Sequence, residues 1–178
     1  MPIDSPEGAA FAAAMKAAMA SPLRDVEVVG PDGMPMRIHK EPEPGVKARI
    51  EVAVGDAGSL VTTVWEPSPV RPAAYPNTLP FIPNVGAGTS AIGSEGRRRA
   101  QVQWFGISDV EGALQQLVAE SVAEGWTRTP LTLRTPGPTR VLTFERGSEA
   151  RTITAVSIRG FGMLSLSDVG PRPPDEAA

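Results

Sequence analysis

The 178-residue sequence contains no cysteine, a single histidine and no long apolar run. Without cysteine there are no disulfides, no thiolate catalysis and no cysteine-ligated zinc or iron–sulfur centres. With only His39, a histidine-rich metal site within one chain is excluded, and a Ser–His–Asp triad would have to use that residue. No apolar stretch approaches the roughly 20 residues of a membrane-spanning helix, and the first residues lack the basic segment of a secretory signal. We therefore expect no catalytic, metal or cofactor site. By default we expect a cytoplasmic protein, and the alternative is one at the periphery of a membrane complex.

The most regular pattern in the chain runs from residue 97 to residue 126. Residues 100–104 alternate apolar and polar side chains, which predicts a half-buried strand. Ser108 and Glu111 then have the spacing of a capping box, and apolar residues at helical spacing predict a helix over 109–124. Gly125 suits the left-handed position that ends a helix.

The first third of the chain predicts one helix followed by antiparallel strands. The helix is alanine-rich, ends near residue 20, and carries a thin apolar seam at Phe11, Met15 and Met19. Alternating residues and turn signals then predict four strands, at 25–29, 34–40, 47–54 and 59–66.

Residues 67–96 are rich in proline and then in glycine. Proline removes backbone donors and fixes φ, so we interpret this segment as a linker between two domains, stiff at first and flexible later. Its glycine-rich part, residues 86–93, resembles a phosphate loop only superficially. Prolines precede it, a strand follows it, and it has no Gly-Lys-Ser/Thr sequence.

The fold class predicted from these patterns is α+β. Two amphipathic helices pack on antiparallel sheet, in two small lobes (residues 1–66 and 97–170) joined by the Pro/Gly-rich linker 67–96. The second lobe also contains predicted strands at 131–135, 140–146 and 151–159, and an edge strand at 161–167. The tail 171–178 is expected to be disordered.

The function favoured by the sequence is that of a non-enzymatic accessory or interaction subunit that docks onto a larger protein assembly. The apolar patch 79–83 within the linker calls for a covering surface, and the strands after the 109–124 helix are rich in arginine while that helix carries only acidic charges. The residues predicted to bind the partner are Leu79, Phe81, Ile82, Arg134, Arg140, Arg146 and Arg151.

Several alternatives remain open at this point. A small-molecule or lipid-binding module would have a pocket between helix and sheet, lined by Trp104, Trp126 and Phe144. An enzyme using only Asp/Glu and Arg chemistry would need carboxylates converging in a cleft. A homo-oligomer joined through an edge strand fits the interaction hypothesis as well. Nucleic-acid binding through the arginines at 97–99 is disfavoured, because the chain is acidic, with a pI of about 5.3.

Overall fold

The computed structural model describes residues 6–40, 43–53, 59–94, 97–130, 137–159 and 161–171. The chain divides into two compact units, Met1–Trp65 and Glu66–Ala178, called unit 1 and unit 2 below. The division falls where the proline-rich segment begins. The predicted strand at 131–135 and all but the first residue of the predicted disordered tail lie outside the described residues.

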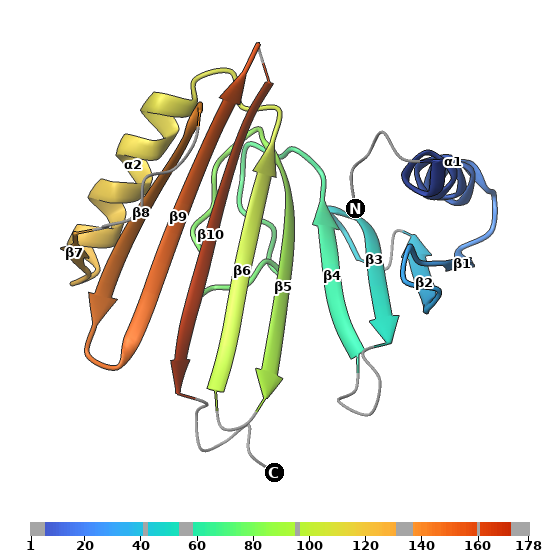
Figure 1. Ribbon diagram of the computed structural model, residues 1–178, viewed down its shortest axis with the longest axis horizontal. Coiled ribbons are helices and arrows are strands. Elements are labelled where there is room, and N and C mark those ends of the chain that lie inside the picture. The colour runs from blue at the N-terminus through green and yellow to red at the C-terminus, as the bar shows by residue number, and fades with distance from the viewer. Residues whose placement is uncertain are drawn as a thin grey trace. The chain divides into compact units, whose positions relative to one another are not determined.

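Unit 1 is an antiparallel sheet with one helix (Figure 1). Its strands lie in the order β1-β2-β3-β4, so each pairs with its neighbours in sequence. The C-terminal half of the helix packs on the sheet, where Ala18 contacts Ile38 and Ala48. Lys40 donates hydrogen bonds to the carbonyl oxygens of Ala18 and Ser21 at the end of the helix. The elements are α1 (Pro6–Ala20), β1 (Asp25–Val29), β2 (Pro35–Lys40), β3 (Val46–Ala53) and β4 (Ser59–Trp65).

Unit 2 is a larger antiparallel sheet, in the order β5-β6-β10-β9-β8-β7. The last strand of the chain, β10, is inserted between β6 and β9 and pairs with both. The elements are β5 (Gly86–Ser94), β6 (Arg97–Phe105), α2 (Val110–Ala123), β7 (Thr127–Thr129), β8 (Thr139–Arg146), β9 (Glu149–Ile158) and β10 (Phe161–Pro171).

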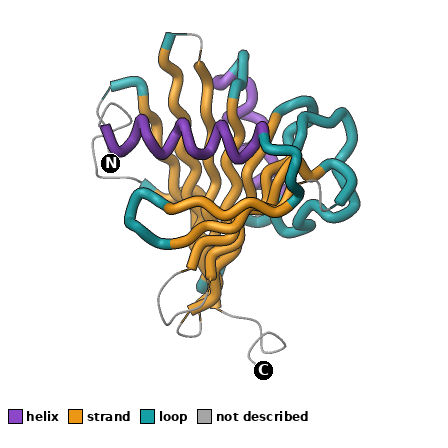
Figure 2. The backbone as a smooth tube through the Cα atoms, turned by 90° about the vertical axis from the view of Figure 1, so that its right-hand side faces the viewer, coloured by secondary structure: helices purple, strands orange, loops and turns teal. Residues whose placement is uncertain are grey.

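The core of unit 2 lies on one face of this sheet. Helix α2 and the segment 66–85 both lie against that face (Figures 1 and 2). Alternate residues of β6, β8, β9 and β10 point toward them, and those in the middle of these strands are buried, together with residues of α2 and of the segment. The principal buried side chains are Tyr75, Leu79, Ile82, Val102, Trp104, Leu114, Leu117, Trp126, Phe144, Ile153, Leu164 and Leu166.

The predicted α+β arrangement of two amphipathic helices packed on antiparallel sheet was wrong, because the structure is mostly antiparallel sheet. Strand makes up 49% of the structure and helix 20%, so antiparallel sheet dominates. Helix α1 has no broad apolar stripe, and Ala18 is its only buried residue. The glycine-rich end of the predicted linker is β5, which pairs along its length with β6. The predicted edge strand 161–167 is part of β10, which is central in unit 2.

Helix α2 agrees closely with its prediction, apart from its first turn. The N-cap is Asp109, whose Oδ1 accepts a hydrogen bond from the Gly112 N–H at 2.9 Å. Glu111 pairs with Arg140 instead of forming a capping box with Ser108. Gly125 adopts φ +87° as predicted, and the Trp126 N–H folds back to the Ser121 carbonyl.

Candidate functional site

The apolar patch predicted to meet a partner is packed against unit 2 itself. Leu79 and Ile82 are 3% and 9% exposed. Phe81 makes an edge-on contact with the ring of Tyr75, with the centroids 5.4 Å apart, and the Tyr75 hydroxyl donates to the Pro80 carbonyl at 2.7 Å. These interactions fix the segment onto its own sheet, so Leu79 and Ile82 contribute little to the exposed surface.

The predicted partner-binding arginines occupy different environments. Arg140 is exposed and pairs with Glu111 at 2.6 Å. Arg146 pairs with Glu149 at 2.9 Å and donates to the carbonyl oxygen of Glu124 at 3.1 Å. Arg151 is buried, with 2% of its side chain exposed, and Arg134 lies outside the described residues. The structure therefore does not gather the four arginines into one basic surface.

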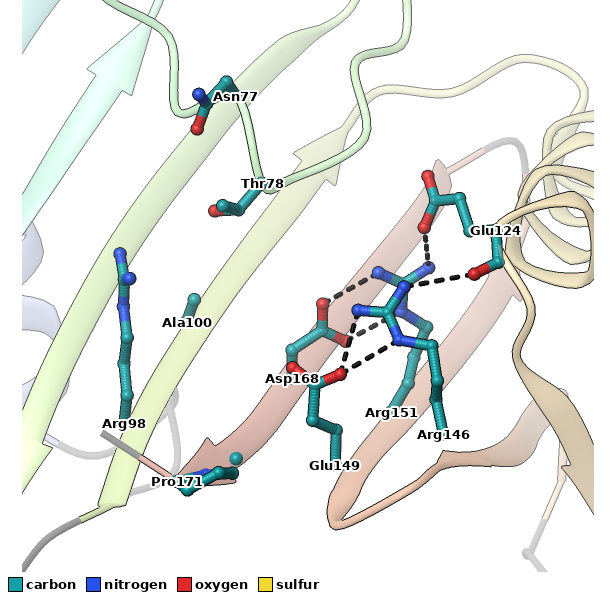
Figure 3. A pocket seen from close by; sticks show the side chains of 11 residues that line it. Asn77, Thr78, Arg98, Ala100, Glu124, Arg146, Glu149, Arg151, Asp168 and Pro171 are labelled. Atoms are coloured by element: carbon teal, nitrogen blue, oxygen red, sulfur yellow. Dashed lines mark hydrogen bonds and ion pairs between the residues drawn. The ribbon is translucent and has the colours of Figure 1, made fainter. Parts of the chain in front are cut away.

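Arg151 is the centre of a buried polar cluster (Figure 3). Its guanidinium binds both carboxylate oxygens of Asp168, each at 2.8 Å, and also donates to Ser121 and Glu124 at 3.0 and 3.2 Å. Burial alone would lower the pKa of Arg151, but the hydrogen bonds and charges of Asp168 and Glu124 outweigh it and raise that pKa. The cluster joins β9, β10 and the end of α2.

Trp126 links the same cluster to β8. The guanidinium carbons of Arg146 and Arg151 each lie 4.4 Å from the Trp126 ring, a distance typical of cation–π contacts. The carboxylates of Glu149 and Asp168 hold the two arginines in these positions. The arrangement anchors the chain where it leaves α2 for β7.

A pocket of about 400 Å³ adjoins this cluster. Ala100 and Gly170, which have small side chains or none, form part of its lining, and Asn77 and Thr78 approach from the segment 66–85 (Figure 3). The pocket's charged lining is balanced, with three arginines and three carboxylates. Arg146 and Arg151 are tied to those carboxylates, so the cluster joins β8, β9 and β10 to the end of α2.

The alternative pocket lined by Trp104, Trp126 and Phe144 is not found among the described residues. All three side chains are buried in the core, and the pockets described above and near α2 and β8 have other linings. The indole N–H groups of Trp104 and Trp126 have no hydrogen-bond partner within the described part of the chain. No group of three His, Asp or Glu side chains there is placed to hold a metal ion. The helices that are described there are too short or too polar to cross a membrane.

The sheet face of unit 2 opposite α2 carries few charges, and we call it the open face. Strand register aligns its residues in rows that cross the sheet. The central row consists of hydroxyl and amide side chains only, directly paired from β7 to β6: Thr129, Thr143, Thr152, Ser167 and Gln101. Ser90 continues this row on β5, but it is buried, with 7% of its surface exposed.

Two further rows continue the open face toward the turn between β9 and β10. None of the residues in these three rows is charged, although charged residues make up 21% of the chain. One row is Val141, Thr154, Ser165, Gln103 and Gly88, and the next is Thr139, Val156, Met163, Phe105 and Gly86.

The end of the open face beyond these rows is apolar and exposed. Phe105 is 45% exposed, Ile158 52% and Phe161 50%. Phe161 pairs directly with Ile158, and Phe105 with Met163, so these side chains form one patch at the ends of three neighbouring strands. Among the strand residues of the face, charge appears at the other end, as Glu145 on β8 and as Arg99 and Arg97 on β6.

Sequence reasoning missed this face, although its signal is visible in the printed sequence. Along β9, threonines 152 and 154 alternate with the buried Ile153 and Ala155. The same alternation gives serines 165 and 167 on β10. Each strand alone resembles an ordinary half-buried strand, and only the register across the sheet collects these residues into an uncharged surface.

No protein-family model, no curated protein and no solved structure matches the chain.

Proposed function

We propose that this protein is a non-enzymatic interaction module that joins a protein assembly through the open face of unit 2. The observation that carries the proposal is a broad, uncharged sheet face with exposed aromatic and aliphatic residues at one end. Interface cores are depleted in charge and enriched in aromatic residues and methionine, and contiguous exposed apolar patches mark interaction sites.

Unit 1 provides an internal comparison. The sheet face that α1 leaves uncovered there carries charged residues in cross-strand pairs. Asp25 pairs with His39, and His39 is directly opposite Arg49 on β3. Glu27 lies 3.9 Å from Arg37, and Glu51 is directly opposite that arginine. This alternation of charge is typical of a sheet face in contact with water.

The contrast supports an interaction role for the open face of unit 2. The same chain places charges on one uncovered sheet face and excludes them from most of the other. A solvated surface does not require such an exclusion, whereas a buried interface does, because each charge removed from water without a partner is costly.

The test is affinity capture of the tagged full-length protein from its own cells, with two matched variants. Phe161→Glu places a charge in the apolar end of the open face. Val122→Glu places the same charge at a residue of α2 that is 57% exposed, on the opposite side of the sheet. Both positions are exposed, so both variants should keep the circular dichroism spectrum and thermal midpoint of the native protein.

We expect the native protein and Val122→Glu to recover the same stoichiometric partner, and Phe161→Glu to lose it. Equal recovery with all three proteins would contradict a role for the open face. If Phe161→Glu loses a partner, that partner is either another protein or a second copy of this chain. Co-capture of two differently tagged copies of the chain distinguishes these two cases.

A further inference from the structure

We propose that the open face pairs with the open face of a second copy of this chain, forming a two-fold symmetric dimer. This inference rests on the proposed function and names its partner. It follows from the chemistry of the face, from its size and from the placement of its few charges.

The central row of the open face is complementary to itself. Hydroxyl and amide side chains both donate and accept hydrogen bonds, so a row of them can bond to an identical row. A face dominated by one sign of charge would repel its own copy. The adjoining apolar end is also self-compatible, because it buries equally well against aliphatic or aromatic residues.

The size of the face suits a stable dimer. Strands about 4.8 Å apart that rise about 3.3 Å per residue give a sheet of this width and strand length an area on the order of 700 Å². A standard stable interface removes roughly 800 Å² from each partner. The face is therefore large enough to hold two copies together without help from other surfaces.

Two of the three charged positions at the far end of the face, Glu145 and Arg99, specify how the copies meet. Glu145 and Arg99 lie in one row, on β8 and β6, and the two central strands β9 and β10 separate them. A two-fold axis running along the strands between β9 and β10 places β8 of each copy over β6 of the other. Arg99 of each copy then faces Glu145 of the other, as an isologous interface requires.

The same axis matches the remaining rows in kind. Thr154 of one copy lies over Ser165 of the other, and Thr152 over Ser167, because these pairs are direct neighbours across β9 and β10. Val156 lies over Met163, and Ile158 over Phe161. Aligned packing of two twisted sheets at about 30° accommodates this arrangement. Along the two central strands, polar residues meet polar residues and apolar residues meet apolar residues, whereas on the flanking strands Val141 lies over Gln103 and Thr139 over Phe105.

Sedimentation equilibrium of the purified full-length protein tests the dimer directly. We expect reversible, concentration-dependent dimers for the native chain. Thr154→Arg should weaken association at least tenfold, because each dimer would bury two unpaired guanidinium groups near its axis. Val122→Glu, which lies off the face, should associate like the native protein.

A charge exchange tests the orientation of the two copies. Arg99→Glu alone, or Glu145→Arg alone, should weaken the dimer a few-fold, because each brings like charges together at two symmetric places. The double variant should recover most of the native affinity. Arg99 and Glu145 are both exposed, so these substitutions should leave folding intact, and circular dichroism verifies it.

Failure of the dimer and failure of the proposed function give different results. A native chain that stays monomeric at hundreds of micromolar overturns the second copy as partner. If Phe161→Glu nevertheless loses a different protein in capture, the interaction role of the open face stands. If the chain is monomeric and capture is independent of Phe161, both proposals are overturned. Dimers that Thr154→Arg does not weaken would also overturn the face-to-face arrangement.

Discussion

At the scale of single residues, Arg151 is expected to be the most sensitive polar position in unit 2. Its side chain is 2% exposed, and its guanidinium donates hydrogen bonds to Asp168, Ser121 and Glu124. Arg151→Ala should lower the free energy of unfolding by about 3–5 kcal/mol, because it leaves partly buried carboxylates without their cation. Urea unfolding followed by tryptophan fluorescence measures the loss.

Arg140→Ala is the matched control for this prediction. Arg140 also forms an ion pair, with Glu111, but its side chain is 61% exposed, so the substitution should cost less than about 1 kcal/mol. The double variant Arg151→Met, Asp168→Leu should be more stable than Arg151→Met alone, because it removes the orphaned carboxylate. Equal losses for Arg151→Ala and Arg140→Ala would refute the assignment of Arg151 as a buried anchor.

Tyr75 offers a second measurement at the same scale, because it is the only tyrosine of the chain. Burial raises the pKa of its phenol well above the ordinary value near 10. The proton is held more tightly in the folded state, so this group's contribution to stability is complete below about pH 10 and is lost as the pH rises further. Tyrosinate absorbance near 295 nm should therefore appear only together with loss of the circular dichroism signal. A separate ionisation of the native protein near pH 10 would contradict the burial of Tyr75.

Arg151 also illustrates what single residues reveal in advance. In the sequence it alternates in phase with Ile153 and Ala155, which are buried. This alternation places Arg151 on the core side of β9, whereas the sequence analysis assigned it to a basic surface that binds a partner. The partners that make burial tolerable, Asp168 and Glu124, come from β10 and α2, and no local pattern connects them.

At the scale of elements, the start of α2 provides a prediction that separates two candidate caps. Asp109 accepts the Gly112 N–H bond, whereas the sequence favoured Ser108. Asp109→Ala should destabilise unit 2 by about 1 kcal/mol, because it leaves a helix N–H unpaired and removes a negative charge from the first turn. Ser108→Ala should change the free energy of unfolding by less than about 0.5 kcal/mol. Chemical denaturation of both variants measures the difference, and the opposite ranking would restore Ser108 as the cap.

Elements with strong local patterns were the ones that the sequence predicted well. Helix α2, strand β6 and the β8–β9 hairpin have regular periods and clear boundaries, and they lie within a few residues of their predicted ranges. Strand β5 was missed because its sequence, GAGTSAIGS, is rich in glycine and small residues that disfavour strands locally. Its full-length pairing with β6 overrides that preference. The open face was missed for a related reason, since it depends on register between strands that are far apart in sequence.

At the scale of the whole molecule, a dimer through the open face makes the stability of unit 2 depend on protein concentration. Association stabilises the folded state by mass action, while the unfolded chain gains nothing. For a unit of this size, a hundredfold rise in concentration above the dissociation constant should raise the unfolding midpoint by roughly 5 °C. Thermal unfolding should be followed in a Trp65→Phe background, because the remaining tryptophans, Trp104 and Trp126, both lie in unit 2.

Two variants determine whether such a shift comes from the open face. Thr154→Arg should show a much smaller shift of its midpoint over the same concentrations, because its copies associate at least tenfold more weakly. Val122→Glu should show the full shift, since its added charge lies on α2. Unfolding must be reversible for the comparison to hold, which repeated scans of one sample establish. If the midpoint of Thr154→Arg still depends fully on concentration, the contact between copies lies on another surface of the chain. If the midpoint of the native protein does not depend on concentration, the chain does not dimerise, and the open face binds a different partner.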